Sequence, residues 1–94
     1  MTKEEAWRTI ESLGLPLAQA AAARRTLGRA TTKEDITITA APSGDLVIAR
    51  SRPGRNGRQV MEDTIRTNGS KEVVQKAYDA AGNLVHFDPK GGTP

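Results

Sequence analysis

The hydrophobic pattern of the chain changes its period once, near Thr31. Before that point, apolar residues recur three or four positions apart, for example at Ala6, Ile10 and Leu13, which is typical of amphipathic helices. After it, apolar and polar residues alternate, which is typical of half-buried strands. This order predicts an α+β fold in which two N-terminal helices pack on a four- or five-stranded antiparallel sheet.

Capping and turn residues predict where the elements begin and end. Thr2 is a helix N-cap, Gly14 ends the first helix, and Pro16 suits the first turn of the second, so residues 3–29 are expected to be helical. Strands are expected at 36–40, 46–50, 59–67, 71–78 and 84–87, within a sheet over 35–88. Residues 91–94 are expected to form a loose tail. A chain of 94 residues fits one domain, 1–94.

Composition excludes several classes of protein. The chain has no Cys and one His, so a disulfide scaffold, a thiolate zinc site, a cysteine nucleophile and two-His metal motifs are all ruled out. The carboxylates are dispersed, so we expect neither a metal nor another cofactor. No apolar run approaches the ~20 residues of a membrane span, and the N-terminus lacks the apolar stretch of a signal peptide.

Positive charge is concentrated in the second half of the chain. Residues 1–47 carry six basic and six acidic side chains, so the net charge of +3 lies in residues 48–94. Arg50, Arg52, Arg55 and Arg58 fall within nine residues without an intervening acid. Arginine forks match phosphate oxygens, so this cluster predicts either a phosphate-binding loop or, with equal weight, a solvated surface loop. If residues 46–52 are extended, Arg50 and Arg52 share a face.

His86 is the only side chain whose ordinary pKa lies near neutrality. In a strand it shares a face with Leu84 and Asp88, and Val85 and Phe87 take the other face. If the helices cover the Val85 side, His86 lies on the open face, where an active site on a sheet would be. The alternative is a half-exposed polar residue on an edge strand.

Further polar residues in the expected strands are of the kinds that orient a phosphate or a base. They are Thr64, Gln75, Lys76 and Tyr78. An aromatic content of 3% argues against a base-stacking platform. A single His with several Arg and no metal suits RNA cleavage, because the substrate's own 2′-hydroxyl is the nucleophile and the protein supplies proton transfer and cations.

The segments 57–69 and 73–90 resemble the C-terminal toxin domains of bacterial polymorphic toxins, of the Rhs/YD-repeat and contact-dependent inhibition types. The phrases Tyr78-Asp-Ala-Ala-Gly-Asn-Leu84 and Val85-His-Phe-Asp-Pro-Lys90 carry the resemblance. Many such domains are ribonucleases of the barnase/EndoU/colicin/RelE-like group, with N-terminal helices followed by an antiparallel sheet that bears a metal-free site. The positions that could match the site residues are His86, Arg50, Arg52, Lys76 and Thr64. Members with two catalytic His have no counterpart here, so an Arg, a Lys or Asp88 would take the second proton-transfer role.

These observations predict a metal-independent antibacterial toxin ribonuclease that cleaves tRNA or another RNA and acts as a monomer. The residues expected to bind RNA are Arg55, Arg58, Gln75, Tyr78 and Lys90. The resemblance implies delivery as part of a larger secreted effector, action in the cytoplasm of the target cell, and an acidic immunity protein as partner. Two alternatives stay open: a non-catalytic basic nucleic-acid-binding module, and an interaction domain whose arginine loop pairs with an acidic partner.

Overall fold

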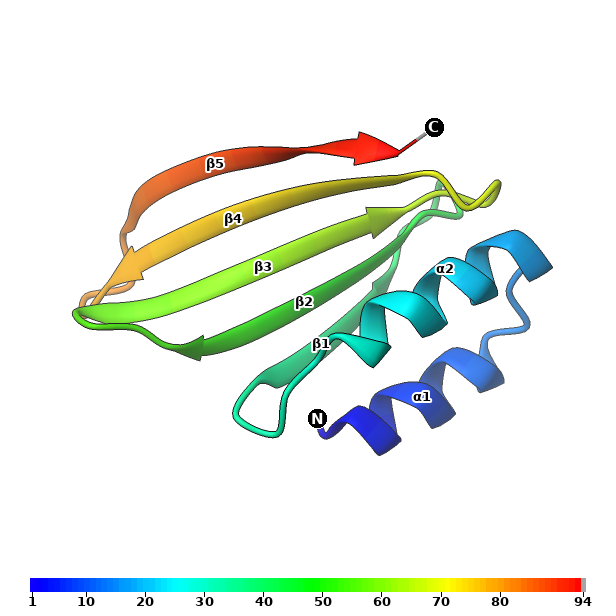
Figure 1. The fold of residues 1–94 in the computed structure, drawn as a ribbon, viewed down its shortest axis with the longest axis horizontal. Coiled ribbons are helices and arrows are strands. Elements are labelled where there is room, and N and C mark those ends of the chain that lie inside the picture. Colours follow the sequence, from blue (N-terminus) through cyan, green and yellow to red (C-terminus); the bar gives the residue numbers. More distant parts are fainter. Residues whose placement is uncertain (94) are drawn as a thin grey trace.

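Two helices precede a five-stranded sheet (Figure 1). The structure is a computed structural model that describes the backbone of residues 1–93 and the side chains of residues 1–90. Helices α1 (Lys3–Ser12) and α2 (Leu17–Gly28) are followed by β1 (Asp35–Ala40), β2 (Leu46–Pro53), β3 (Gly57–Ile65), β4 (Lys71–Asp79) and β5 (Leu84–Thr93). Each strand pairs antiparallel with the next, in the order β1-β2-β3-β4-β5. The predicted α+β fold is confirmed, with five strands.

The helices begin and end close to the predicted residues. Thr2 and Glu5 form a capping box before α1: the Glu5 backbone N–H donates to Thr2 Oγ1 at 3.2 Å, and the Thr2 N–H donates to Glu5 Oε1 at 2.9 Å. Gly14 takes a φ of 61°, a left-handed conformation that glycine adopts without strain. Pro16 is the N-cap of α2 rather than a residue of its first turn. Neither described helix is long and apolar enough to cross a membrane.

The C-terminal residues extend the sheet, which corrects the prediction of a loose tail. β5 continues to Thr93, whose partner is Lys71 at the start of β4. Two register shifts interrupt this pairing, one between Val73 and Val74 and one between Ala77 and Tyr78. Pro89, which pairs with Val74, is tolerated because β5 is an edge strand. The prediction for residue 94 lies outside the described residues.

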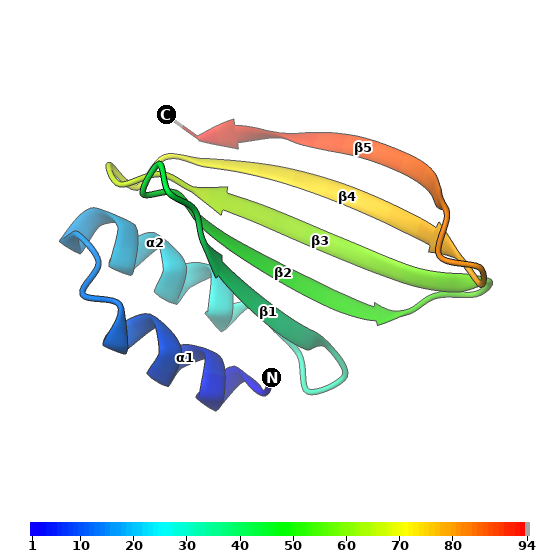
Figure 2. The same cartoon turned by 180° about the vertical axis from the view of Figure 1, so that it is seen from behind.

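The helices pack on one face of the sheet, over β1, β2 and β3 (Figures 1 and 2). The buried apolar side chains come from both layers and are Ala6, Ile10, Ala22, Ala23, Leu27, Ile36, Leu46, Ile48 and Ile65. The alternation of β2 places Leu46 and Ile48 in this core. Figure 1 shows the strands extending beyond the helices at the end where β2 turns into β3 and β4 into β5. The helix-facing side of the sheet is therefore only partly covered.

A buried polar cluster joins α2 to the sheet. Asp63 is 2% exposed, and its Oδ2 lies 3.2 Å from Lys71 Nζ and 3.5 Å from Thr26 Oγ1. Nearby, the Gln19 side-chain amide donates to the carbonyl oxygens of Gly44 and Ile65, each at 2.9 Å. These bonds attach α2 to β3 and to the turn before β2. They offset part of the cost of burying the two polar side chains, each of which keeps one oxygen without a partner among the described residues.

Candidate functional site

The strand register brings polar side chains into two rows on the helix-facing side of the sheet. One row crosses β2 to β5 through Arg52, Gln59, Ala77 and His86. The next row, closer to the helices, consists of Arg50, Met61, Gln75 and Asp88. Because directly paired residues point to the same face, both rows share the face that carries the core. They lie on the part of that face that extends beyond the helices.

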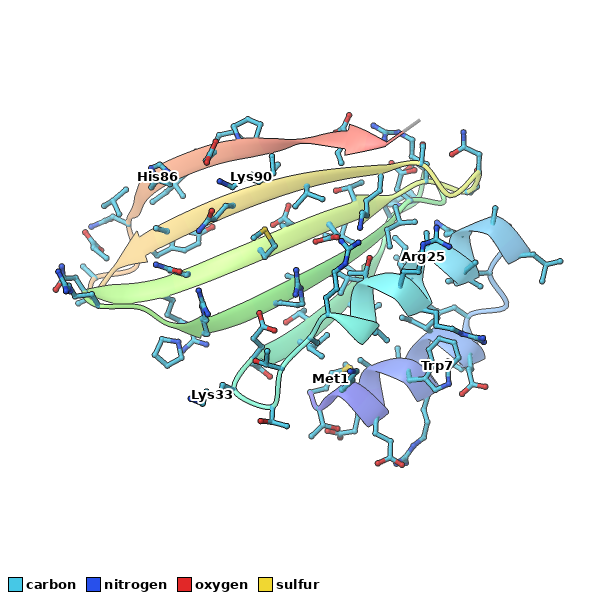
Figure 3. All side chains as sticks on the ribbon, viewed as in Figure 1. Met1, Trp7, Arg25, Lys33, His86 and Lys90 are labelled. Atoms are coloured by element: carbon cyan, nitrogen blue, oxygen red, sulfur yellow. The ribbon has the colours of Figure 1, made fainter. Side chains whose placement is uncertain are left out.

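A cleft lies between these rows and the connection from α2 to β1. Its volume is about 250 Å³, and its lining includes Thr31, Glu34, Arg50, Gln59, Met61 and Gln75. A second hollow continues past Arg52 toward Lys33 and Arg55. Figure 3 shows Lys33 on the loop before β1, and His86 and Lys90 on β5. The two hollows therefore bring together cations from two separate parts of the chain, the α2–β1 connection and the segment 50–55.

Arg50 forms the wall of the cleft rather than a free anion-binding group. Its Nη1 lies 3.8 Å from Glu34 Oε1 and donates to the Arg29 carbonyl oxygen at 3.3 Å. The side chains of Arg50 and Glu34 are only 12% and 11% exposed. Glu34 Oε1 also accepts from the Thr31 N–H at 2.8 Å. Arg50 thus holds the α2–β1 connection against the sheet.

Arg52 is the arginine best placed to meet a phosphate. Its side chain is exposed, and its Nη2 donates to Gln59 Oε1 at 3.3 Å. His86 lies in the same row, three strand spacings away, which is a backbone separation of about 14 Å. The small side chain of Ala77 lies between Gln59 and His86.

His86 lies on the face opposite to the one expected from the sequence, yet it is exposed. The helices pack on the His86 side, but they lie over β1 to β3 and His86 is on β5. The register shift pairs Leu84 with Tyr78, so Leu84 takes the other face and does not share the face of His86. The condition under which His86 was expected on the open face, helices on the Val85 side, does not hold, and His86 is exposed because β5 lies beyond the helices.

Asp88 and Lys90 form an ion pair beside His86. Lys90 Nζ lies 2.6 Å from Asp88 Oδ2. This hydrogen bond, together with the charges of Lys90 and His86, holds the pKa of Asp88 below its ordinary value. The carboxylate therefore stays ionised near neutral pH and keeps the Lys90 ammonium group close to the row of His86.

The structure places four other predicted residues on the opposite face of the sheet. They are Arg58, Thr64, Lys76 and Tyr78, which alternate with residues of the two rows along β3 and β4. Lys76 Nζ pairs with Glu62 Oε2 at 3.2 Å, and Arg58 Nε donates to Ser51 Oγ at 2.8 Å. The predicted catalytic group is thus divided: His86, Arg50 and Arg52 share one face with Gln75, and Lys76 and Thr64 do not join them.

Several residues of the site were missed by the sequence analysis. Glu34, Gln59 and Met61 line the cleft, and Lys33 lies beside it. Only Gln59 had a usable signal, because it directly follows the arginine cluster. Among the described side chains, no group of three or more His, Asp or Glu residues could hold a metal ion.

Comparison with protein-family models, with curated protein sequences and with solved structures found no match to this chain. The expectation of a polymorphic-toxin domain therefore rests on the sequence phrases at 78–90 and on the order of helices and strands.

Proposed function

We propose that this protein is a metal-independent toxin ribonuclease whose site is the row from Arg52 to His86. The observation that carries the proposal is that an exposed guanidinium and an exposed imidazole lie in one row, on the part of the sheet face that the helices leave uncovered. This arrangement supports cleavage in which the substrate's 2′-hydroxyl attacks its neighbouring phosphorus. The bond to the 5′-oxygen breaks, which leaves a 2′,3′-cyclic phosphate and a 5′-hydroxyl end.

In this reaction His86 moves a proton and Arg52 stabilises charge. The imidazole takes the proton of the 2′-hydroxyl as general base or gives one to the departing 5′-oxygen as general acid. Arg52 binds the non-bridging phosphate oxygens, whose negative charge grows in the transition state. For the second proton transfer, Lys90 is better placed than Lys76, because Lys90 lies on β5 beside Asp88 and Lys76 is on the far face.

The biological setting of the proposal follows from the resemblance to polymorphic toxins. We propose tRNA or another cellular RNA as substrate, delivery within a larger effector, and action in the cytoplasm of a competing bacterium. An acidic immunity protein would bind the cationic surface formed by Lys33, Arg52 and Arg55, since charge complementarity accelerates and orients such association.

The proposal is tested with purified protein, total bacterial RNA and a chelator. The wild type is expected to produce fragments with 2′,3′-cyclic phosphate ends. His86→Ala should lower the cleavage rate by about 10²- to 10⁴-fold, which is the usual contribution of general acid–base catalysis. Lys76→Ala is the matched control on the opposite face and should cleave at the wild-type rate. Intact RNA after incubation with the wild type, or full activity of His86→Ala, would contradict the proposal.

A non-catalytic nucleic-acid-binding module is the second candidate. It is favoured by the long separation between Arg52 and His86, about 14 Å at the backbone, which leaves the imidazole without a nearby cation across the row. This candidate predicts RNA binding without cleavage. The binding constant would fall steeply with salt, His86→Ala would change it little, and Arg52→Ala would weaken binding and reduce the salt dependence.

A further inference from the structure

The floor of the cleft lies one row closer to the helices than Arg52 and His86. It is formed by Met61 and Gln75, and the Arg50–Glu34 pair stands beside it as a wall. The volume of about 250 Å³ is several times the ~30 Å³ that one water molecule occupies in the liquid. It is below the ~300–1,000 Å³ of sites for drug-sized ligands. The cleft is therefore of a size for a single ring system.

The hydrogen-bonding groups of the cleft are unequally occupied. Arg50 is engaged by Glu34 and by the Arg29 carbonyl, and Gln59 Oε1 accepts from Arg52. The half-buried Gln75 amide, in contrast, makes no hydrogen bond with any described residue. Arg50 Nε also lacks a partner in the described part of the chain, but it is fully enclosed and out of reach of a ligand. The Gln75 amide is only half-buried, so it can bond to a ligand that enters the cleft.

The free amide determines which base the cleft suits. A glutamine side chain offers one donor and one acceptor, which pair with the N7 and the amino group of adenine. Guanine presents two acceptors, O6 and N7, and is matched by the fork of an arginine. Among the arginines that line the cleft, Arg50 is engaged by Glu34 and the Arg29 carbonyl, and Arg52 donates to Gln59 and is the group assigned to the phosphate. The thioether of Met61 adds a polarizable surface for an aromatic ring.

We propose that this cleft is an adenine-binding subsite, with Gln75 reading the edge of the base and Met61 beneath the ring. The inference rests on the proposed function, because it places the adenine next to the phosphate held between Arg52 and His86. The ribonuclease would then cleave preferentially at adenosine positions. Arg50 is a positioning residue here: it holds the wall of the cleft and does not read the base.

The subsite is tested by binding, separately from cleavage. We would titrate the ¹⁵N-labelled protein with AMP, GMP, CMP, UMP and ribose 5-phosphate and follow the side-chain amide signals of the glutamines by NMR. AMP is expected to bind most tightly and to shift the Gln75 amide. Gln75→Ala should weaken AMP binding by about tenfold, as for loss of one bidentate contact. The same loss is expected for Gln75→Glu, which keeps the size of the side chain. Thr64→Ala, on the opposite face, should bind AMP like the wild type.

The outcomes separate the subsite from the nuclease. Equal binding of ribose 5-phosphate and AMP, or preference for any other nucleotide, would overturn the adenine assignment even if the protein cleaves RNA. Selective AMP binding through Gln75 by a protein that leaves RNA intact would support the subsite and overturn the ribonuclease. If the wild type cleaves preferentially at adenosine positions and Gln75→Ala loses this preference, the result would support both the subsite and the ribonuclease.

Discussion

Removing the Lys71 ammonium group should destabilise the protein far more than removing the cation of a shorter ion pair on the surface. Lys71 and Asp63 lie 3.2 Å apart with side chains 12% and 2% exposed, whereas Arg66 and Glu72 lie 2.8 Å apart with side chains 40% and 61% exposed. The two pairs differ mainly in burial. Distance alone would predict that the Arg66–Glu72 pair contributes more to stability, whereas burial predicts that the Lys71–Asp63 pair does.

The expected magnitudes follow from the surroundings of each pair. At 3.2 Å and an effective dielectric of about 20, the attraction between Lys71 and Asp63 is ~5 kcal/mol, which offsets the cost of taking both charges out of water. Lys71→Met leaves the Asp63 carboxylate buried without its cation and should lower the free energy of unfolding by about 3–5 kcal/mol. Arg66→Met removes a solvent-screened pair and should lower it by about 0–1 kcal/mol.

Equilibrium unfolding in urea at pH 7, followed by circular dichroism, measures both free energies. The double variant Asp63→Val/Lys71→Met removes both buried charges and should recover most of the stability lost in Lys71→Met, because a buried ion pair and an apolar pair of similar volume are often equivalent. The reasoning is refuted if Lys71→Met unfolds within 1 kcal/mol of the wild type, or if the double variant is less stable than Lys71→Met.

Three further outcomes are expected. Thr2→Ala removes the capping box of α1 and should lower the free energy of unfolding by about 0.5–2 kcal/mol in the same urea assay. Gly57→Ala would place a Cβ 1.9 Å from a backbone oxygen of β4. In the control Gly82→Ala the Cβ meets open space, and only the φ of 87° costs stability, by about 1–3 kcal/mol. The thermal midpoint of Gly57→Ala should therefore fall well below that of Gly82→Ala. Hydrogen bonds from the N-terminal ammonium group to Asp35, and from backbone N–H groups to Asp79, lower the pKa of both carboxyls. Their stabilisation is therefore complete above the ordinary value of 3.8 and is lost as the pH falls through the lower folded-state pKa, so the urea midpoint should decline only in acid.

The two faces of the sheet explain why the site was only partly predictable. Alternation along one strand assigned Arg50 and Arg52 to a common face, as the structure confirms. Relating a residue on β3 or β4 to His86 requires the register between strands, and a shift of one residue reverses every assignment. The shift at Ala77 and Tyr78 moves Leu84 to the face opposite His86. Lys76 was grouped with His86 by residue type, but it pairs with Phe87, the neighbour of His86, so the two side chains lie on opposite faces.

The role of Arg50 depended on packing rather than on strand pattern. Its charge and its position in the arginine cluster were visible in the sequence, and both favoured a phosphate ligand. The structure instead pairs it with Glu34, sixteen positions earlier in the chain by number, within a nearly buried contact. Such a pair depends on where the α2–β1 connection crosses the sheet, which neither segment specifies alone.

The sequence by itself determined the local elements of this protein. Hydrophobic period, the Thr2 cap and the glycine turns are local properties, and they predicted two helices followed by four or five antiparallel strands. The tertiary structure decided which half of the sheet the helices cover, which face each strand residue takes, and that residues 91–93 join β5. These outcomes depend on register and packing between distant segments. The basic surface beside the cleft, with Lys33, Arg52 and Arg55, exists only once those segments meet.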